Sequence, residues 1–229
     1  MNYLKYCLAP PKIKWALRKL GNKERVTILD VGCGNHSPRL TKRYIPQCEY
    51  HGVDITEYNL DSDDKRLMDR FTIVDINGGG YNGIQKDYYD YIILNHVIEH
   101  MKKYEPVLDR LCQCLRLGGC IYIAFPAEKS LAMPSAEGTL QFSDDMSHLY
   151  LPSIREVANV LLKNRVKVVY GGRSKDLLRS TIGIPLLAWQ YFRRAFGQKM
   201  HARGLWFILG FESVVIGVKE FERGSREQR

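Results

Sequence analysis

Short apolar runs alternate with amphipathic segments along most of the chain. Runs of a few apolar and β-branched residues are typical of buried parallel strands, because such strands are covered on both faces. Segments with apolar residues three and four positions apart indicate helices between them. This alternation predicts a doubly wound α/β sheet. The predicted strands are residues 26–31, 50–54, 71–76, 89–95, 120–125, 166–170 and 212–218, and the predicted helices are residues 10–21, 38–45, 105–115 and 153–163.

The most informative stretch is residues 28–34, Ile-Leu-Asp-Val-Gly-Cys-Gly, where an apolar run ends in an acidic residue and a Gly-x-Gly turn. Glycine lets the backbone turn sharply and approach a ligand that a Cβ would exclude. Asp54 ends the next strand 24 residues after Asp30, near the spacing of about 20 at which an acid meets a ribose. Ser37 stands where dinucleotide enzymes carry a third glycine, which disfavours an NAD-dependent reductase. Asn35 tolerates positive φ and is expected to complete the turn.

The wording Leu-Asp-Val-Gly-Cys-Gly resembles motif I of class I S-adenosylmethionine (SAM)-dependent methyltransferases. Residues 96–101, His-Val-Ile-Glu-His-Met, are similar to the motif IV region of the small-molecule, type 11-like branch of that family. The chain departs from the family at His36, where a third glycine is usual. The resemblance implies a Rossmann-like, mostly parallel seven-stranded sheet with an antiparallel last strand. The length of 229 residues favours one domain over residues 1–229. It consists of a core that carries the resemblance (26–172 and 211–219), with a basic N-terminal helix (1–25) and a helical insertion (173–210) outside it.

In a doubly wound sheet the ligand lies across the carboxyl ends of the strands. The resemblance implies SAM at that edge, with its methionine portion wrapped by the Gly-x-Gly loop. Asp54 would then hold the ribose hydroxyls, Asp75 and the Ile76 backbone would lie near adenine, and Asn95 and His96 would lie near the methionine end. For each acid the alternative is a simple strand-end cap. The predicted cofactor-binding residues are Asp30, Gly32, Cys33, Gly34, Asp54, Ile55, Asp75, Ile76, Asn95 and His96.

Methyl transfer is an in-line displacement from a sulfonium, and a base is needed only where the acceptor loses a proton. We predict His148 and His100 as catalytic residues, because histidine titrates near neutral pH. His148 is preferred because it lies on the long polar loop after the fifth strand. Asp144, Asp145 and Glu99 are further candidates. The alternative is that His148 only caps or packs its loop, and that His100 and Glu99 only shape the acceptor side.

Composition restricts the compartment and the ligands. The six cysteines form no Cys-x-x-Cys pair, so we expect free thiols in a reducing cytosol and no metal site. No apolar run approaches the ~18 residues that span a bilayer, and the start of the chain lacks the apolar core of a signal peptide. We therefore expect a cytoplasmic protein.

The net charge of +9 is concentrated in residues 1–25 and 173–203, each with seven Lys/Arg and one acidic residue. Such segments suit an anionic partner, namely a membrane surface, a phosphorylated substrate or nucleic acid; the alternative is a pair of solvated helix faces. In residues 176–204 aromatic residues interleave with arginines, as in an interfacial helix on anionic lipid. We expect peripheral contact with the inner face of a membrane there; the alternative is a lid over the substrate.

The sequence thus predicts a SAM-dependent methyltransferase that acts on a small molecule. The resemblance implies that the acceptor is an oxygen on a sugar or on a glycan or lipid precursor. One alternative is an RNA-directed methyltransferase. It is disfavoured because residues 95–98 lack the Asn-Pro-Pro-Tyr of amino-directed base methylases and no RNA-binding module is recognisable. The other is a non-catalytic scaffold of the same fold at a membrane.

Overall fold

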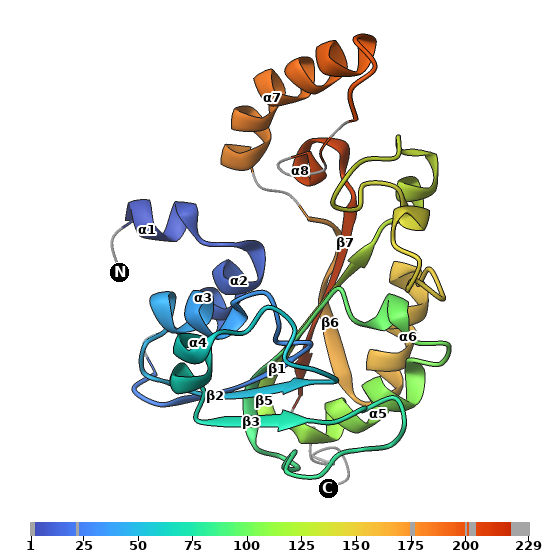
Figure 1. The fold of residues 1–229 in the computed structure, drawn as a ribbon. Coiled ribbons are helices and arrows are strands. Elements are labelled where there is room, and N and C mark those ends of the chain that lie inside the picture. Colours follow the sequence, from blue (N-terminus) through green and yellow to red (C-terminus); the bar gives the residue numbers. More distant parts are fainter. Residues whose placement is uncertain (1–2, 22, 175–176, 200, 202–204, 221–229) are drawn as a thin grey trace, which may run out of the picture.

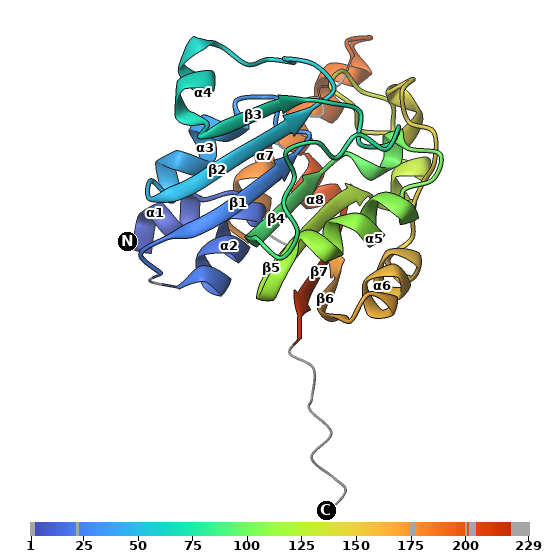
Figure 2. The same ribbon diagram turned by 90° about the horizontal axis from the view of Figure 1, so that it is seen from below.

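One seven-stranded sheet organises the computed structural model, which describes residues 3–21, 23–174, 177–199, 201 and 205–220. The strand order is β3-β2-β1-β4-β5-β7-β6, and β7 is the one strand of this sheet that runs opposite to the others. The prediction of a doubly wound, mostly parallel sheet with an antiparallel last strand is confirmed (Figures 1 and 2). The strands are β1 (Val26–Val31), β2 (Cys48–Asp54), β3 (Arg70–Ile73), β4 (Tyr89–Asn95), β5 (Leu115–Pro126), β6 (Val166–Arg173) and β7 (Glu212–Lys219).

Helices connect the strands and cover both faces of the sheet. Figure 2 shows α1, α2 and α3 on one side of the sheet and α5 and α6 on the other. The α-helices are α1 (Tyr3–Leu8), α2 (Pro11–Leu20), α3 (Ser37–Tyr44), α4 (Ser62–Leu67), α5 (Glu105–Cys114), α6 (Ile154–Lys163), α7 (Leu177–Ala195) and α8 (Trp206–Leu209). The 3-10 turns are η1 (Ile98–His100), η2 (Glu128–Ala132) and η3 (Phe142–Asp144).

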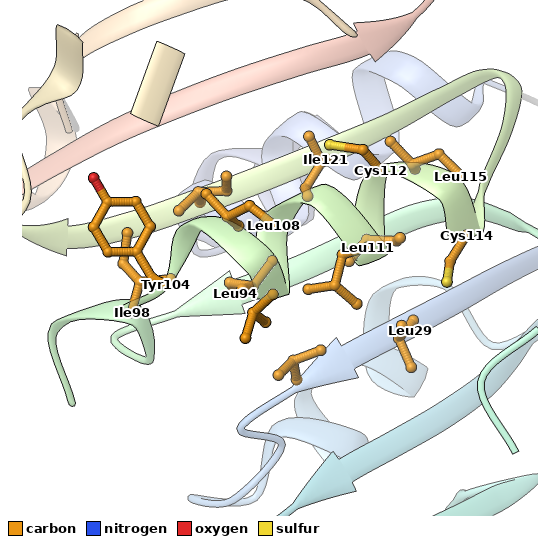
Figure 3. Close-up of a cluster of buried hydrophobic side chains, with 14 of the residues drawn as sticks. Leu29, Leu94, Ile98, Tyr104, Leu108, Leu111, Cys112, Cys114, Leu115 and Ile121 are labelled. Atoms are coloured by element: carbon orange, nitrogen blue, oxygen red, sulfur yellow. The ribbon is translucent and has the colours of Figure 1, made fainter. Parts of the chain in front are cut away.

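The core is divided into two layers by the sheet. Successive side chains of a strand point to opposite faces, so Ile28 and Leu29 of β1 belong to different buried clusters. Leu29 packs with Leu108 and Leu111 of α5, as Figure 3 shows. Both faces of the central strands are therefore apolar, which explains their nearly continuous hydrophobic runs.

Three strand boundaries differ from the prediction by three residues or more: the end of β3, the start of β5, and the end of β6, which lies at Arg173 rather than at residue 170. β3 ends at Ile73 rather than at residue 76, because after Val74 the chain turns at Asp75, whose carboxylate accepts the Asn77 N–H at 2.9 Å. β5 begins at Leu115 rather than at residue 120. Its register shifts where it pairs with the start of β4, so the two glycines at 118–119 lie inside the strand instead of before it.

The inserted helices lie at the carboxyl edge of the parallel strands. Glu212, the first residue of β7, pairs with Pro126, the last residue of β5, so the chain that leads into β7 must approach along that edge. α8 and α7 occupy this position in Figure 1. In the described part of the chain, no helix has the length and hydropathy that a bilayer crossing requires.

Candidate active site

The glycine turn after β1 is shaped by contacts within the chain. Gly32 has φ of 71°, and a Cβ there would lie 2.5 Å from the Val97 side chain. A Cβ on Gly34 would lie 2.7 Å from the carbonyl oxygen of Tyr58. The fold itself therefore requires these glycines. Their prediction rested only on the close approach of a ligand. Asn35 has positive φ as expected, and the neighbouring His36 shares that conformation.

Asp30 lies beneath this turn and is fully buried. Its Oδ2 accepts hydrogen bonds from Ser37 Oγ (2.5 Å) and Tyr50 Oη (2.7 Å). Lys12 Nζ donates to Ser37 Oγ at 2.5 Å and lies 3.6 Å from the same Asp30 oxygen. Burial, together with the Asp30 charge, raises the pKa of Tyr50 well above its usual range, so the phenol stays a donor. Asp30 therefore supports the loop from inside the protein.

Lys12 was not predicted as part of the site. It lies four residues before Ala16, on the buried face of α2. A lysine at an apolar position of a helix was the signal in the sequence, because a buried lysine is rare unless it is paired.

The predicted residues after β2 and β3 lie at one edge of the sheet. The Asp54 carboxylate accepts the N–H groups of Gly34 (3.0 Å) and Ile55 (2.8 Å). Asp54 is thus a strand-end cap, but a carboxylate has about four lone-pair sites and can accept more donors. The Ile55 side chain is 65 % exposed. The Val74 N–H donates to the Asp54 carbonyl at 2.8 Å, which ties the two loops together next to Asp75.

Two predicted residues present no side chain to this edge. Cys33 is fully buried, and a Cβ on the adjacent Gly52 would lie 2.7 Å from its Sγ. Burial, followed by the Asp30 charge, raises the pKa of the Cys33 thiol, so the thiol stays neutral. Ile76 belongs to the hydrophobic core. Each offers only its backbone to a ligand.

His96 follows Asn95 at the end of β4 and is held between two carboxylates. Its Nδ1 lies 3.0 Å from Glu99 Oε1 and its Nε2 lies 3.0 Å from Glu212 Oε2. Burial alone would lower the pKa of His96, but the hydrogen bonds and charges of Glu212 and Glu99 raise it to about 10. The imidazole is therefore a cation at neutral pH.

The inserted helices complete the surroundings of His96. Its ring centroid lies 5.0 Å from that of Trp206 in α8 and 5.9 Å from that of Phe211. Neither these aromatic residues nor Glu212 was predicted, since they lie more than a hundred positions from His96 in the chain.

The two predicted catalytic histidines come together from separate segments. His100 ends η1, and His148 lies on the loop after β5; their ring centroids are 4.9 Å apart. The His148 Nδ1 lies 2.6 Å from the Phe142 carbonyl oxygen, and the His100 Nδ1 lies 3.0 Å from Ser147 Oγ. Nε2 is therefore the nitrogen that each ring can offer to a ligand, and that of His148 lies 3.9 Å from Asp145 Oδ2. Glu99 lies beside them and is fully buried.

Asp144 is excluded from the candidate bases. Its Oδ2 accepts the N–H groups of Ala136, Leu140 and Gln141 at 2.8–3.1 Å. Burial would raise the pKa of Asp144, but these bonds and one from Ser135 lower it. The carboxylate is thus an ionised organiser of the loop.

Known proteins share both sequence and fold with this chain. The model of a methyltransferase-domain family matches residues 7–169. A stretch of 102 residues is 32 % identical to an uncharacterised protein of Methanocaldococcus jannaschii; it covers 42 % of this chain and only 27 % of that protein.

Solved structures of low sequence identity have the same fold. A SAM-dependent methyltransferase from Archaeoglobus fulgidus has a TM-score of 0.58 at 15 % identity and covers 91 % of both chains. Phosphoethanolamine N-methyltransferase 2 of Haemonchus contortus has a TM-score of 0.63 at 14 % identity, over 92 % of this chain and 52 % of that one. At such identities the shared property is the fold. Together with the family match over most of the chain, it confirms the resemblance: this chain belongs to the methyltransferase-domain family of class I SAM-dependent methyltransferases.

Proposed function

We propose that this chain transfers a methyl group from SAM to an oxygen of a small-molecule acceptor, a sugar or a glycan or lipid precursor. The observation that carries the proposal is the arrangement of the carboxyl edge. Asp54, Ile55 and Asp75 lie at the ends of β2 and β3, and the adjacent His100 and His148 lie on loops after β4 and β5. Hydrogen-bond acceptors for a nucleoside, and bases for the hydroxyl group that receives the methyl group, therefore share one rim of the sheet.

The residues of this edge fit a sulfonium nucleoside. Asp54 has acceptor capacity left for ribose hydroxyls, and the exposed Ile55 offers apolar surface to adenine. The backbone of the Gly32–Gly34 turn and Asn95 would hold the methionine portion, with Asp30 and Cys33 supporting the turn from inside. Bound SAM supplies an activated methyl group. The protein then has to orient the acceptor and exclude water, which contributes up to about 7–11 kcal/mol of barrier reduction.

The acceptor side is assigned to His100 and His148. An alcohol must lose its proton as the new bond to the methyl carbon forms. The Nε2 atoms of the two rings are the groups that would receive the hydroxyl, because both Nδ1 atoms are already engaged.

Calorimetric titration with SAM, S-adenosylhomocysteine and NAD tests the cofactor assignment. We expect micromolar binding of the first two ligands and no heat from NAD. Asp54→Asn should weaken the binding of SAM at least about tenfold. The amide NH₂ group of asparagine cannot accept the Gly34 or the Ile55 N–H, and a hydrogen bond to a charged acceptor contributes about 1.5–3 kcal/mol. Asp87→Asn is the matched control, since Asp87 pairs with Lys219 away from this edge. Absence of SAM binding by folded protein would reject the proposal and favour the scaffold alternative.

We also propose that α7 touches an anionic membrane surface. Trp189, Phe192 and Phe196 are spaced by three and four residues and form one outward stripe, with exposed fractions of 56 %, 55 % and 70 %. Their rings contact one another in sequence, with centroid separations of 5.8 and 4.8 Å. The opposite face packs through Leu186 and Leu187 onto the loop after β5. Arg193 and Arg194 lie between Phe192 and Phe196 in the sequence, and the segment carries the positive excess that attracts anionic headgroups.

A further inference from the structure

Three potential metal ligands converge beside the acceptor edge. One carboxylate oxygen of Glu99 and one ring nitrogen each of His100 and His148 lie within 4.8 Å of one another. Glu99 and His100 come from η1 after β4, whereas His148 comes from the loop after β5. The backbone joins these segments as well, because the Leu149 N–H donates to the Glu99 carbonyl oxygen at 2.8 Å.

The two imidazoles are oriented in the manner of metal ligands. A ligating histidine usually donates its other ring N–H to a carbonyl, carboxylate or hydroxyl, which fixes the tautomer and the ring direction. The His148 Nδ1 lies 2.6 Å from the Phe142 carbonyl oxygen, so this nitrogen carries the proton and Nε2 carries the lone pair. The His100 Nδ1 lies near Ser147 in the same way, 3.0 Å from Oγ and 3.3 Å from the carbonyl oxygen.

The third ligand, the carboxylate of Glu99, has an oxygen that is not satisfied by the protein groups described. Glu99 is fully buried, and within the described residues its Oε2 has no hydrogen-bond partner. The same holds for Oε1 of Glu212. His96 lies against only one oxygen of each carboxylate, Oε1 of Glu99 and Oε2 of Glu212, so the other oxygen of each lacks a donor among the described residues. Buried carboxylates are usually hydrogen-bonded, paired or bound to a metal ion.

We propose that Glu99, His100 and His148 form a binding site for a divalent transition-metal ion. Imidazole ligands favour zinc and other first-row transition metals, whereas magnesium and calcium prefer sites made of oxygen atoms alone. Three protein ligands leave at least one position open for water or a substrate oxygen. With bonds of about 2.0–2.2 Å the ligand atoms must approach one another on binding, and the part-exposed His100 ring has room to move.

A second group of similar composition also contains a fully buried carboxylate, Asp64, with an oxygen that lacks a hydrogen-bond partner among the described residues. His36, Asp61 and Asp64 also lie within 4.8 Å of one another. There, however, the Arg39 guanidinium already lies 2.5 Å from Asp61 and 3.7 Å from Asp64. A resident cation repels a metal ion, so His36 provides a matched control for the proposed site.

The ion site lies at the rim where the proposed acceptor would bind. Its open position would hold the acceptor oxygen beside the SAM edge. The placement of the acceptor oxygen rests on the proposed function, whereas binding of the ion does not.

The test is metal titration of untagged protein that has been freed of metal with a chelator. Zn²⁺ is titrated by calorimetry, and Co²⁺ is followed by the visible absorption of its ligand field. We expect one ion per chain. His148→Ala and Glu99→Gln should each weaken binding at least about tenfold, and His36→Ala should leave it unchanged. His148 decides the result if the buried Glu99 variant fails to fold, because His148 lies on a loop.

Two outcomes would overturn the site. One is the absence of stoichiometric uptake by folded protein, and the other is equal uptake by the wild type and His148→Ala. S-adenosylhomocysteine is titrated into the same preparations. If S-adenosylhomocysteine binds but no metal is taken up, only the ion site is rejected, and His100 and His148 remain the proposed proton acceptors. If metal is taken up but S-adenosylhomocysteine does not bind, the proposed function is rejected and the ion site stands.

Discussion

At the scale of single residues, the polar base of the glycine turn depends on pairing inside the protein. Lys12 and Asp30 are both buried, and Ser37 bridges them. A buried pair of this kind adds little net stability over an apolar pair, but removing one partner leaves an uncompensated charge. The position of the turn therefore depends on Lys12, which lies on α2, the helix before the first strand.

Lys12→Met should destabilise the protein by about 3–5 kcal/mol, because the Asp30 carboxylate loses its buried counter-ion. The measurement is urea unfolding followed by circular dichroism. Lys19→Met, an exposed position on the same helix, should change the free energy of unfolding by less than about 0.5 kcal/mol. Adding Asp30→Asn to Lys12→Met should recover part of the loss. If the two lysine variants were equally stable, the pairing would not matter.

At the scale of secondary-structure elements, local signals placed most boundaries within two residues. α6 begins within one residue of its predicted start, and a capping box holds that start: Ser153 Oγ accepts the Glu156 N–H and the Glu156 carboxylate accepts the Ser153 N–H. The short β3 and the early start of β5 were missed, because a hydrogen-bonded turn and a shift in register depend on neighbouring strands.

Ser153→Ala should lower the free energy of unfolding by about 1 kcal/mol, since α6 then loses one partner for its first N–H groups. Ser153→Asp should restore most of that stability, because aspartate caps equally well and favours the helix N-terminus. Thermal unfolding of the three proteins measures the difference. Equal stability of the serine and alanine proteins would show that tertiary packing alone holds the start of α6.

At the scale of the whole molecule, the segment between β6 and β7 has two sides with different surroundings. On the inner side, Trp206 and Phe211 lie against the His96 ring. The outer side carries the aromatic stripe of α7. The proposed membrane contact and the proposed acceptor rim therefore lie at the same end of the sheet, as expected for an acceptor drawn from or near a lipid surface.

Replacing Trp189, Phe192 and Phe196 together by serine should reduce binding to phosphatidylglycerol-containing vesicles at least about tenfold, because the interfacial apolar area is lost. Flotation of the full chain measures this binding. Leu117→Ser/Leu162→Ser removes two exposed leucines elsewhere and should have no effect. Flotation of the stripe variant at the wild-type level would reject the lipid surface and favour the lid alternative.

The sequence by itself determined the class of fold and the carboxyl ends of most of its parallel strands. The spacing of apolar residues and the polar residues at the ends of the apolar runs are local properties of the sequence. Asp30, Asp54 and Asn95 could therefore be placed at strand ends without coordinates. Only the tertiary structure decided which residues meet across long stretches of chain. His100 approaches His148 because β4 and β5 are parallel neighbours whose following loops leave the same edge of the sheet. Glu212 reaches His96 because β7 begins at that edge, beside the end of β5. Such contacts depend on the sheet order and on close packing, neither of which leaves a periodic trace in the sequence.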